Sequence, residues 1–252
     1  MPVPSLVPST APSRPRRVLI VVPAFNEQGV VGDVVRELAR TVDHDVLVVD
    51  DGSADRTSQV ATAAGARVLT LPFNIGVGGA MRTGFRYAVR KGYDGVVQVD
   101  ADGQHDPAFV PELIDALAGA DVVIGARFAG VGGYSVGGLR RAAMRMLSFG
   151  ISTLASTRLT DVTSGFRASG PRALALFAES YPPEYLGDTV ESLVLAHRAG
   201  LELAQLPVAM RARQVGHPSQ NLSRSIVYLS RAVLILLLAS IRVGPTSPRT
   251  PG

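Results

Sequence analysis

Apolar runs and amphipathic stretches alternate along most of the chain. Five runs rich in Val, Ile and Leu show no in–out alternation, which is typical of buried strands. They cover residues 17–23, 45–53, 66–71, 95–103 and 121–127. Stretches between them carry apolar positions at helical spacing, at residues 30–41, 55–64, 76–92 and 107–118. This order predicts a Rossmann-like α/β domain of three layers, in which helices cover both faces of a mostly parallel central sheet.

The pattern is looser after residue 127. It predicts a polar loop at 161–167, a late strand at 201–213, and helices at 137–157, 171–179 and 188–199.

A strongly apolar segment at 225–242 predicts a C-terminal helix. Its longest uncharged stretch, Ala232–Ile241, has ten residues, whereas a membrane-spanning helix needs about 20. The helix either packs on the domain or lies on a membrane surface, where its arginines would reach anionic headgroups. At the other end, residues 1–16 are rich in Pro, Ser and Thr and predict a disordered tail. The expected division is therefore a tail at 1–16, one α/β domain at 17–222, and an amphipathic or apolar helix with a tail at 223–252.

The amino-acid composition restricts the kinds of metal site and binding partner that the chain could have. The 252 residues include no cysteine, which excludes disulfides and thiolate metal sites, so any metal would be bound by oxygen or histidine. The net charge of +4 favours anionic partners such as a nucleotide or a phospholipid surface. The basic residues are spread rather than clustered, which argues against a nucleic-acid partner. No apolar leader is visible in residues 1–17, and we expect a cytoplasmic protein, which would be peripheral on the cytoplasmic face of the membrane if its C-terminal helix lies there.

Two acids one residue apart follow the fourth apolar run, in "VVQVDADGQHDP" at 96–107. Alternation along a strand would direct the side chains of Asp100 and Asp102 to the same face. Hard carboxylate oxygens at this spacing suit Mg²⁺ or Mn²⁺ bridging to substrate phosphates. The alternative is a solvated turn, with Gly103 ending the strand.

Other acids also follow predicted strands. Glu27 comes after the first strand, and Asp50 and Asp51 end the second. In parallel α/β sheets, ligands bind beyond the carboxyl ends of the strands, so these acids indicate a site at that edge. The glycine-rich stretch "NIGVGGAMRTG" at 74–84 fits the dinucleotide-binding spacing poorly and instead predicts a close approach of a helix to the sheet or to a ligand.

Six segments in register resemble the GT-A glycosyltransferases of family 2, of the dolichyl- or polyprenyl-phosphate sugar synthase type. They are "VPAFNE", "VVDDGS", "NIGVGGA", "DADGQHDP", "GAR" at 125–127 and "DVTSGFR" at 161–167. The resemblance covers roughly residues 18–220.

The resemblance implies a role for each matching position. The nucleobase side of the donor site would be formed by Pro23, Phe25, Glu27, Val49 and Asp51. The D-x-D element would be Asp100, Ala101 and Asp102, with both aspartates on the metal and Gln104 nearby. Donor or acceptor phosphate would contact Arg127 and Arg213. The acceptor-side loop would consist of Ser164, Gly165, Phe166 and Arg167. An acid opening a later helix would be Glu191, with Asp188 as its competitor.

The implied activity is an inverting, metal-dependent transfer of a sugar from a nucleotide-diphospho-sugar, GDP-mannose or UDP-glucose, to polyprenyl phosphate at the membrane surface. An alternative keeps the fold and uses a saccharide or small soluble hydroxyl compound as the acceptor, in which case Glu191 or Asp188 would be the general base. A further alternative is a non-catalytic module that binds nucleotide sugars.

Overall fold

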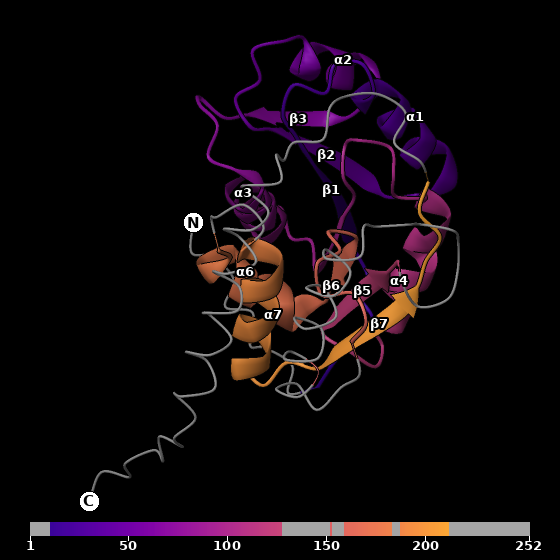
Figure 1. The fold of residues 1–252 in the computed structure, drawn as a ribbon, viewed down its shortest axis with the longest axis vertical. Coiled ribbons are helices and arrows are strands. Elements are labelled where there is room, and N and C mark those ends of the chain that lie inside the picture. The colour runs from indigo at the N-terminus through magenta and orange to yellow at the C-terminus, as the bar shows by residue number, and fades with distance from the viewer. Residues whose placement is uncertain (1–10, 128–151, 153–158, 183–186, 212–252) are drawn as a thin grey trace, which may run out of the picture.

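The structure is a computed structural model, which describes residues 11–127, 152, 159–182 and 187–211. Its centre is a seven-stranded sheet in the order β3-β2-β1-β4-β6-β5-β7 (Figure 1). The strands are β1 (Val18–Ala24), β2 (Asp45–Asp50), β3 (Arg67–Thr70), β4 (Gly95–Gln98), β5 (Val122–Ala126), β6 (Arg167–Ser169) and β7 (Leu203–Pro207). The predicted mostly parallel sheet is confirmed.

One strand of the sheet runs against the others. β6 pairs antiparallel with β4 on one side and with β5 on the other, so that Ala168 faces both Val97 and Val123. The remaining neighbours, β1 with β2 and β4, β2 with β3, and β5 with β7, are parallel. The sequence predicted a polar loop where β6 begins, so this strand was missed.

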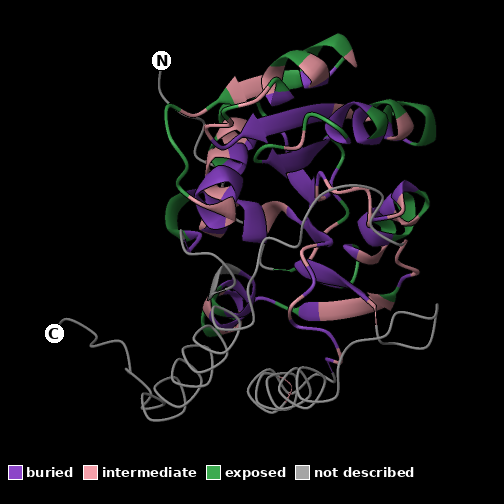
Figure 2. Ribbon diagram, turned by 45° about the horizontal axis from the view of Figure 1, so that its top comes forward, coloured by how far each residue is buried: buried purple, intermediate pink, exposed green. Residues whose placement is uncertain are grey.

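Helices cover both faces of the sheet, as predicted. They are α1 (Val31–Thr41), α2 (Thr57–Ala63), α3 (Val77–Arg90), the 3-10 helix η1 (Pro107–Phe109), α4 (Val110–Ala116), α6 (Pro171–Ser180) and α7 (Gly187–Arg198). Buried residues concentrate in the strands and on the inner faces of the helices (Figure 2).

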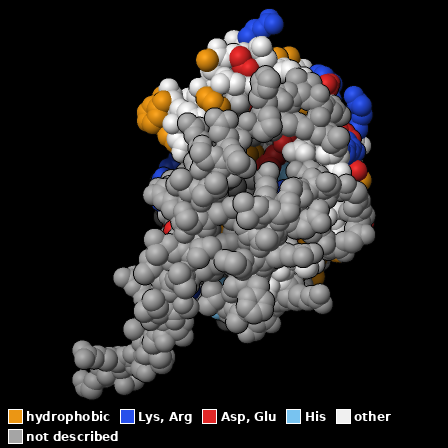
Figure 3. Space-filling model, viewed as in Figure 1, with side chains coloured by type: hydrophobic (Ala, Val, Ile, Leu, Met, Phe, Trp, Pro, Cys, Tyr) orange, Lys and Arg blue, Asp and Glu red, His pale blue; other side chains and the backbone are white. Residues whose placement is uncertain are grey.

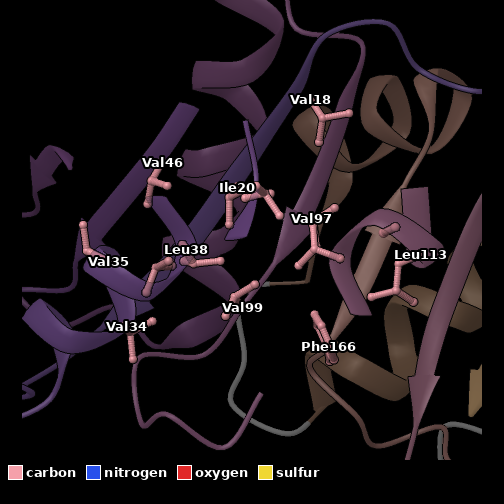
Figure 4. Packing of buried hydrophobic residues seen from close by; sticks show 14 of the residues in the cluster. Val18, Ile20, Val34, Val35, Leu38, Val46, Val97, Val99, Leu113 and Phe166 are labelled. Atoms are coloured by element: carbon pink, nitrogen blue, oxygen red, sulfur yellow. The ribbon is translucent and has the colours of Figure 1, made fainter. Parts of the chain in front are cut away.

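Two hydrophobic clusters, one on each face, hold the three layers together. On one face Leu19 and Val21 of β1 pack with residues of α3, α6 and α7. On the other face Ile20 of β1 packs with α1 and α4, where Leu38 and Leu113 are fully buried (Figure 4). Alternate residues of one strand therefore enter opposite cores, which explains why the strands read as continuous apolar runs.

The glycine-rich stretch permits the close helix–sheet approach that the sequence predicted. A Cβ atom on Gly84 of α3 would lie 2.6 Å from Cγ1 of Val21. Gly76, which precedes α3, has a φ of +86°, a conformation that favours glycine.

Two predicted segments differ in the structure, one in where it ends and the other in its contacts. The strand predicted at 95–103 ends at Gln98, because the chain turns at residues 101–102, before Gly103 with its φ of +74°. Part of the predicted tail contacts the domain: Pro15 is buried, and the backbone amide of Arg16 donates to Asp94 over 2.9 Å.

Several predictions fall outside the described residues. They are the tail at 1–10, the helix at 137–157, Arg213, and the C-terminal helix at 225–242 with its possible membrane contact. Among the helices that the structure describes, none has the length and apolar character needed to cross a membrane.

Candidate functional site

The carboxyl ends of β1, β2, β4 and β5 lie along one edge of the sheet, and most of the predicted site residues follow these ends. In the described part of the surface shown in Figure 3, acidic, basic and hydrophobic side chains are all visible. Phe25, in the loop after β1, is 46% exposed, whereas Pro23 and Val49 are buried in the strands behind it.

The loop after β1 is joined to the loop after β2 by hydrogen bonds. Asn26 has a φ of +56°, and its amide donates to Ser53 Oγ over 2.9 Å while its Oδ1 accepts from the amide of Ala54 over 2.9 Å. The amide of Glu27 donates to Thr57 Oγ1 over 2.9 Å. These contacts fix the rim of the site that carries Phe25 and Glu27.

Asp51 holds the loop that leads into α3. Its side chain is buried, and its two carboxylate oxygens accept from the amides of Ile75 and Gly76 over 2.8 and 2.9 Å. Burial raises the pKa of the Asp51 carboxyl above its usual value, and the two amide hydrogen bonds oppose part of that rise. In this structure Asp51 therefore holds the loop before α3 through backbone contacts, and its predicted contact with a donor stays a prediction.

Asp100 and Asp102 lie in the turn after β4. Ala101 between them is 3% exposed and packs in the core, whereas both aspartates are partly exposed. Asp100 Oδ1 accepts from Gln98 Nε2 over 3.1 Å, and Asp102 Oδ1 accepts from the amide of Gln104 over 3.0 Å. Both aspartates therefore lie in a turn outside the paired strand, partly exposed on either side of the buried Ala101, and the prediction that their side chains share one face stays a prediction.

The predicted acceptor-side loop lies directly against this turn. A Cβ atom on Gly165 would be 2.9 Å from Nε2 of Gln98 and 3.0 Å from Oδ2 of Asp100, so a larger residue would require these side chains to shift. Ser164, Phe166 and Arg167 are all buried, and Gly165 alone in the loop is partly exposed. The structure therefore brings the loop and the aspartates together, and any acceptor contact here would involve the loop backbone.

Arg127, at the end of β5, forms an ion pair with Asp161. Its Nε and Nη2 donate to the two oxygens of Asp161 over 2.6 and 2.9 Å, and Nη2 also donates to Thr163 Oγ1 over 2.8 Å. Burial alone would raise the pKa of Asp161, but the hydrogen bonds and charge of Arg127 hold it below its usual value. In this structure the guanidinium anchors the acceptor-side loop, and its predicted contact with phosphate stays a prediction.

Arg167 links the same loop to α7. Its guanidinium donates to the carbonyl oxygens of Ser164, Val162 and Thr189 over 2.7 to 2.8 Å, and to Ser192 Oγ over 3.0 Å. Arg167 is 5% exposed, so its role here is internal.

Glu191, one of the two candidate acids on α7, is exposed. It lies between Thr189 and Ser192, the two residues of this helix that accept hydrogen bonds from Arg167. Asp188 lies one residue inside the start of the same helix.

A buried histidine beside the aspartates was not singled out from the sequence. His105 is 4% exposed, its Nδ1 accepts from the amide of Asp100 over 2.9 Å, and its ring stacks on Phe166. It lies in the quoted stretch "DADGQHDP", but neither its spacing nor its polar neighbours indicated burial.

The paired aspartates fit a divalent cation that is shared with a substrate. Within the described ranges, no group of three or more His, Cys, Asp or Glu side chains could hold a metal ion alone. Mg²⁺ is commonly bound through one or two carboxylates together with substrate phosphates. The side chain of Asp100 is 37% exposed, so its carboxylate is open to such a ligand.

Comparisons with known proteins agree with the motifs. The sequence signature of the family described as "Glycosyl transferase family 2" matches residues 19–173. The undecaprenyl-phosphate mannosyltransferase of Micrococcus luteus is 33% identical over 216 residues, which cover 81% of this chain and 88% of that protein. The polyprenol monophosphomannose synthase of Mycolicibacterium smegmatis is 33% identical over 165 residues, which cover 61% of each chain.

Solved structures share the fold. Glucosyl-3-phosphoglycerate synthase from Mycobacterium tuberculosis, in complex with Mg²⁺ and uridine diphosphate, matches with a TM-score of 0.68 and 25% identity over 92% of this chain and 81% of that chain. The same enzyme with Mn²⁺, uridine diphosphate and phosphoglyceric acid matches with a TM-score of 0.67 and 24% identity, covering 92% of this chain and 80% of that chain.

Proposed function

The chain belongs to glycosyl transferase family 2, and from this membership we propose that it transfers a sugar from a nucleotide-diphospho-sugar to polyprenyl phosphate at a membrane surface, with inversion at the sugar. The observation that carries the proposal is the pair of partly exposed aspartates at the carboxyl edge of the sheet, of which Asp100 lies against Gly165. Relatives named for undecaprenyl-phosphate and polyprenol sugar transfer support the lipid acceptor. GDP-mannose and UDP-glucose are the proposed donors.

In the proposed reaction, an oxygen of the acceptor phosphate attacks the anomeric carbon of the donor sugar. The bond from that carbon to the diphosphate oxygen breaks, and its electron pair leaves with the nucleoside diphosphate. Mg²⁺ or Mn²⁺, held by Asp100 and Asp102 with Gln104 in the same turn, would neutralise charge that grows on the leaving diphosphate. Structural neighbours that contain Mn²⁺ or Mg²⁺ support this assignment.

The remaining residues have proposed roles on either side of the aspartates. The donor side comprises the rim that carries Phe25 and Glu27, with Pro23, Val49 and Asp51 behind it. The acceptor side comprises the loop 164–167, in which Arg167 donates to the carbonyl oxygen of Ser164, while Arg127 holds the preceding residues Asp161 and Thr163. Arg213, which lies outside the described residues, is proposed to contact the donor phosphates on the resemblance to the family alone.

A transfer assay tests the proposal. The protein is incubated with Mn²⁺, radiolabelled GDP-mannose or UDP-glucose, and polyprenyl phosphate in detergent, and the products are extracted into organic solvent. We expect label in the organic phase only when lipid and metal are both present. Label that moves instead to a soluble saccharide would establish the hydroxyl acceptor, and no turnover with any donor would favour a binding module.

The acceptor determines what Glu191 does. A lipid phosphate is already anionic at neutral pH and attacks without a base, so Glu191→Gln should change kcat by less than about 10-fold. A hydroxyl acceptor needs a general base, whose loss costs about 10²–10⁴-fold in rate. Steady-state kinetics on Glu191→Gln therefore separate the two acceptors. Glu112→Gln is the matched control, since Glu112 is an exposed acid in the first turn of α4.

A further inference from the structure

The imidazole of His105 contacts Asp100 through both ring nitrogens. Nδ1 accepts from the backbone amide of Asp100 over 2.9 Å, and Nε2 lies 3.5 Å from Asp100 Oδ2. A neutral imidazole that accepts at Nδ1 carries its proton on Nε2, and this nitrogen lies within electrostatic range of the Asp100 carboxylate, at a distance longer than a normal hydrogen bond. One side chain thus bonds to the backbone of Asp100 and also lies beside its carboxylate.

The ring face of His105 packs against the acceptor-side loop. Its ring stacks on Phe166 with centroids 4.7 Å apart and an angle of 13° between the planes. Phe166 is fully buried and follows Gly165, whose backbone lies against the Asp100 carboxylate. The imidazole is therefore held between the loop and the aspartate turn, and any rotation of the ring would move both.

The backbone of His105 is fixed as well. It forms a β-bridge with Met210, and the side chain of Arg211 reaches back to Asp106 over 2.8 Å and to Glu37 over 2.7 Å. A buried side chain held at its backbone, its ring face and Nδ1 has little freedom to reorient. Such a side chain can transmit that orientation to the carboxylate in front of it.

We propose that His105 is a positioning residue that orients the Asp100 carboxylate toward the cation and links this orientation to the acceptor-side loop through Phe166. The inference rests on the proposed function, because it requires that Asp100 bind a cation together with a nucleoside diphosphate. His105 itself contacts neither the donor nor the cation. Its removal should weaken cation binding without removing a ligand.

Mn²⁺ titrations followed by thermal shift, at a fixed concentration of GDP or UDP, test this role without requiring turnover. His105→Phe keeps an aromatic ring for the stack and loses both nitrogen contacts. It should raise the Mn²⁺ concentration for half-maximal stabilisation about 10- to 100-fold, the usual effect of removing a group that orients a metal ligand. His105→Gln, whose amide can donate where Nε2–H did, should recover part of that loss.

Tyr93→Phe is the matched control for stability alone. Tyr93 is also buried, and its hydroxyl donates to Asp45 over 2.5 Å at the opposite edge of the sheet. This variant should lower the melting temperature and leave the Mn²⁺ dependence unchanged.

If the unmodified protein shows Mn²⁺-dependent stabilisation and His105→Phe shows the same half-saturation, the positioning role is overturned while the proposed function stands. If no nucleotide gives Mn²⁺-dependent stabilisation of the unmodified protein, the proposed function fails and the inference fails with it.

Discussion

Asparagine in place of Asp100 or Asp102 is expected to lower the rate of sugar transfer by about 10²–10³-fold for each substitution, the magnitude typical of removing one group that stabilises developing charge. The substitution removes negative charge while it keeps an oxygen that can accept a hydrogen bond. The contacts of Asp100 with Gln98 Nε2 and of Asp102 with the amide of Gln104 can therefore persist. The loss should come from weaker cation binding, and the measurement is kcat/KM over a range of Mn²⁺ concentrations.

Asp33→Asn is the matched control for the removal of one carboxylate. Asp33 is an exposed residue of α1, and its ion pair with Arg36 lies on the surface. The rate of this variant should equal that of the unmodified protein. A double variant of Asp100 and Asp102 that kept its rate and its Mn²⁺ dependence would remove the basis of the proposed mechanism.

Most of the fold was predictable because each parallel strand is buried on both faces. β1 and β2 read as unbroken apolar runs, since alternate residues enter the two cores. β6 was not predictable in this way. It has three residues, Arg167–Ser169, and two of them are polar. Their burial depends on the position of β6 between β4 and β5 and on the partners that Arg167 finds in distant segments.

The positions of the candidate site residues were more predictable than their contacts. The acids that follow strands do lie at the carboxyl edge, because that edge is set by the direction of the parallel strands. A sequence pattern does not reveal that the Asp51 carboxylate bonds to amides at residues 75 and 76, or that Arg127 pairs with Asp161. These contacts join segments that are 24 and 34 residues apart, and only the folded arrangement brings them together. His105 was missed for the same reason.

Asp161→Asn is expected to destabilise the fold by about 3–5 kcal/mol, the range found when one partner of a buried ion pair is removed. The side chain of Asp161 is 0% exposed and that of Arg127 is 14% exposed. The variant would leave the guanidinium largely buried without its counter-charge, and the amide would replace an acceptor oxygen by a donor. Thermal or urea unfolding measures the effect. The control is Asp115→Asn, which removes an Asp–Arg contact of 2.7 Å whose side chains are 64% and 61% exposed, and should cost at most about 1 kcal/mol.

The pH dependence of this difference follows from the sign of the pKa shift. The pKa of Asp161 is lowered in the folded protein, so the folded state binds this proton more weakly than the unfolded chain does. The stabilisation by Asp161 is therefore complete above the unfolded pKa of about 3.9 and is lost as the pH falls from there through the lower folded pKa. The stability difference between the unmodified protein and Asp161→Asn should be constant from pH 7 to about pH 5 and should shrink below about pH 4. A difference that instead grew toward acid pH would mean that Asp161 is protonated more readily in the folded state, and the ion pair with Arg127 would not be what holds the acceptor-side loop.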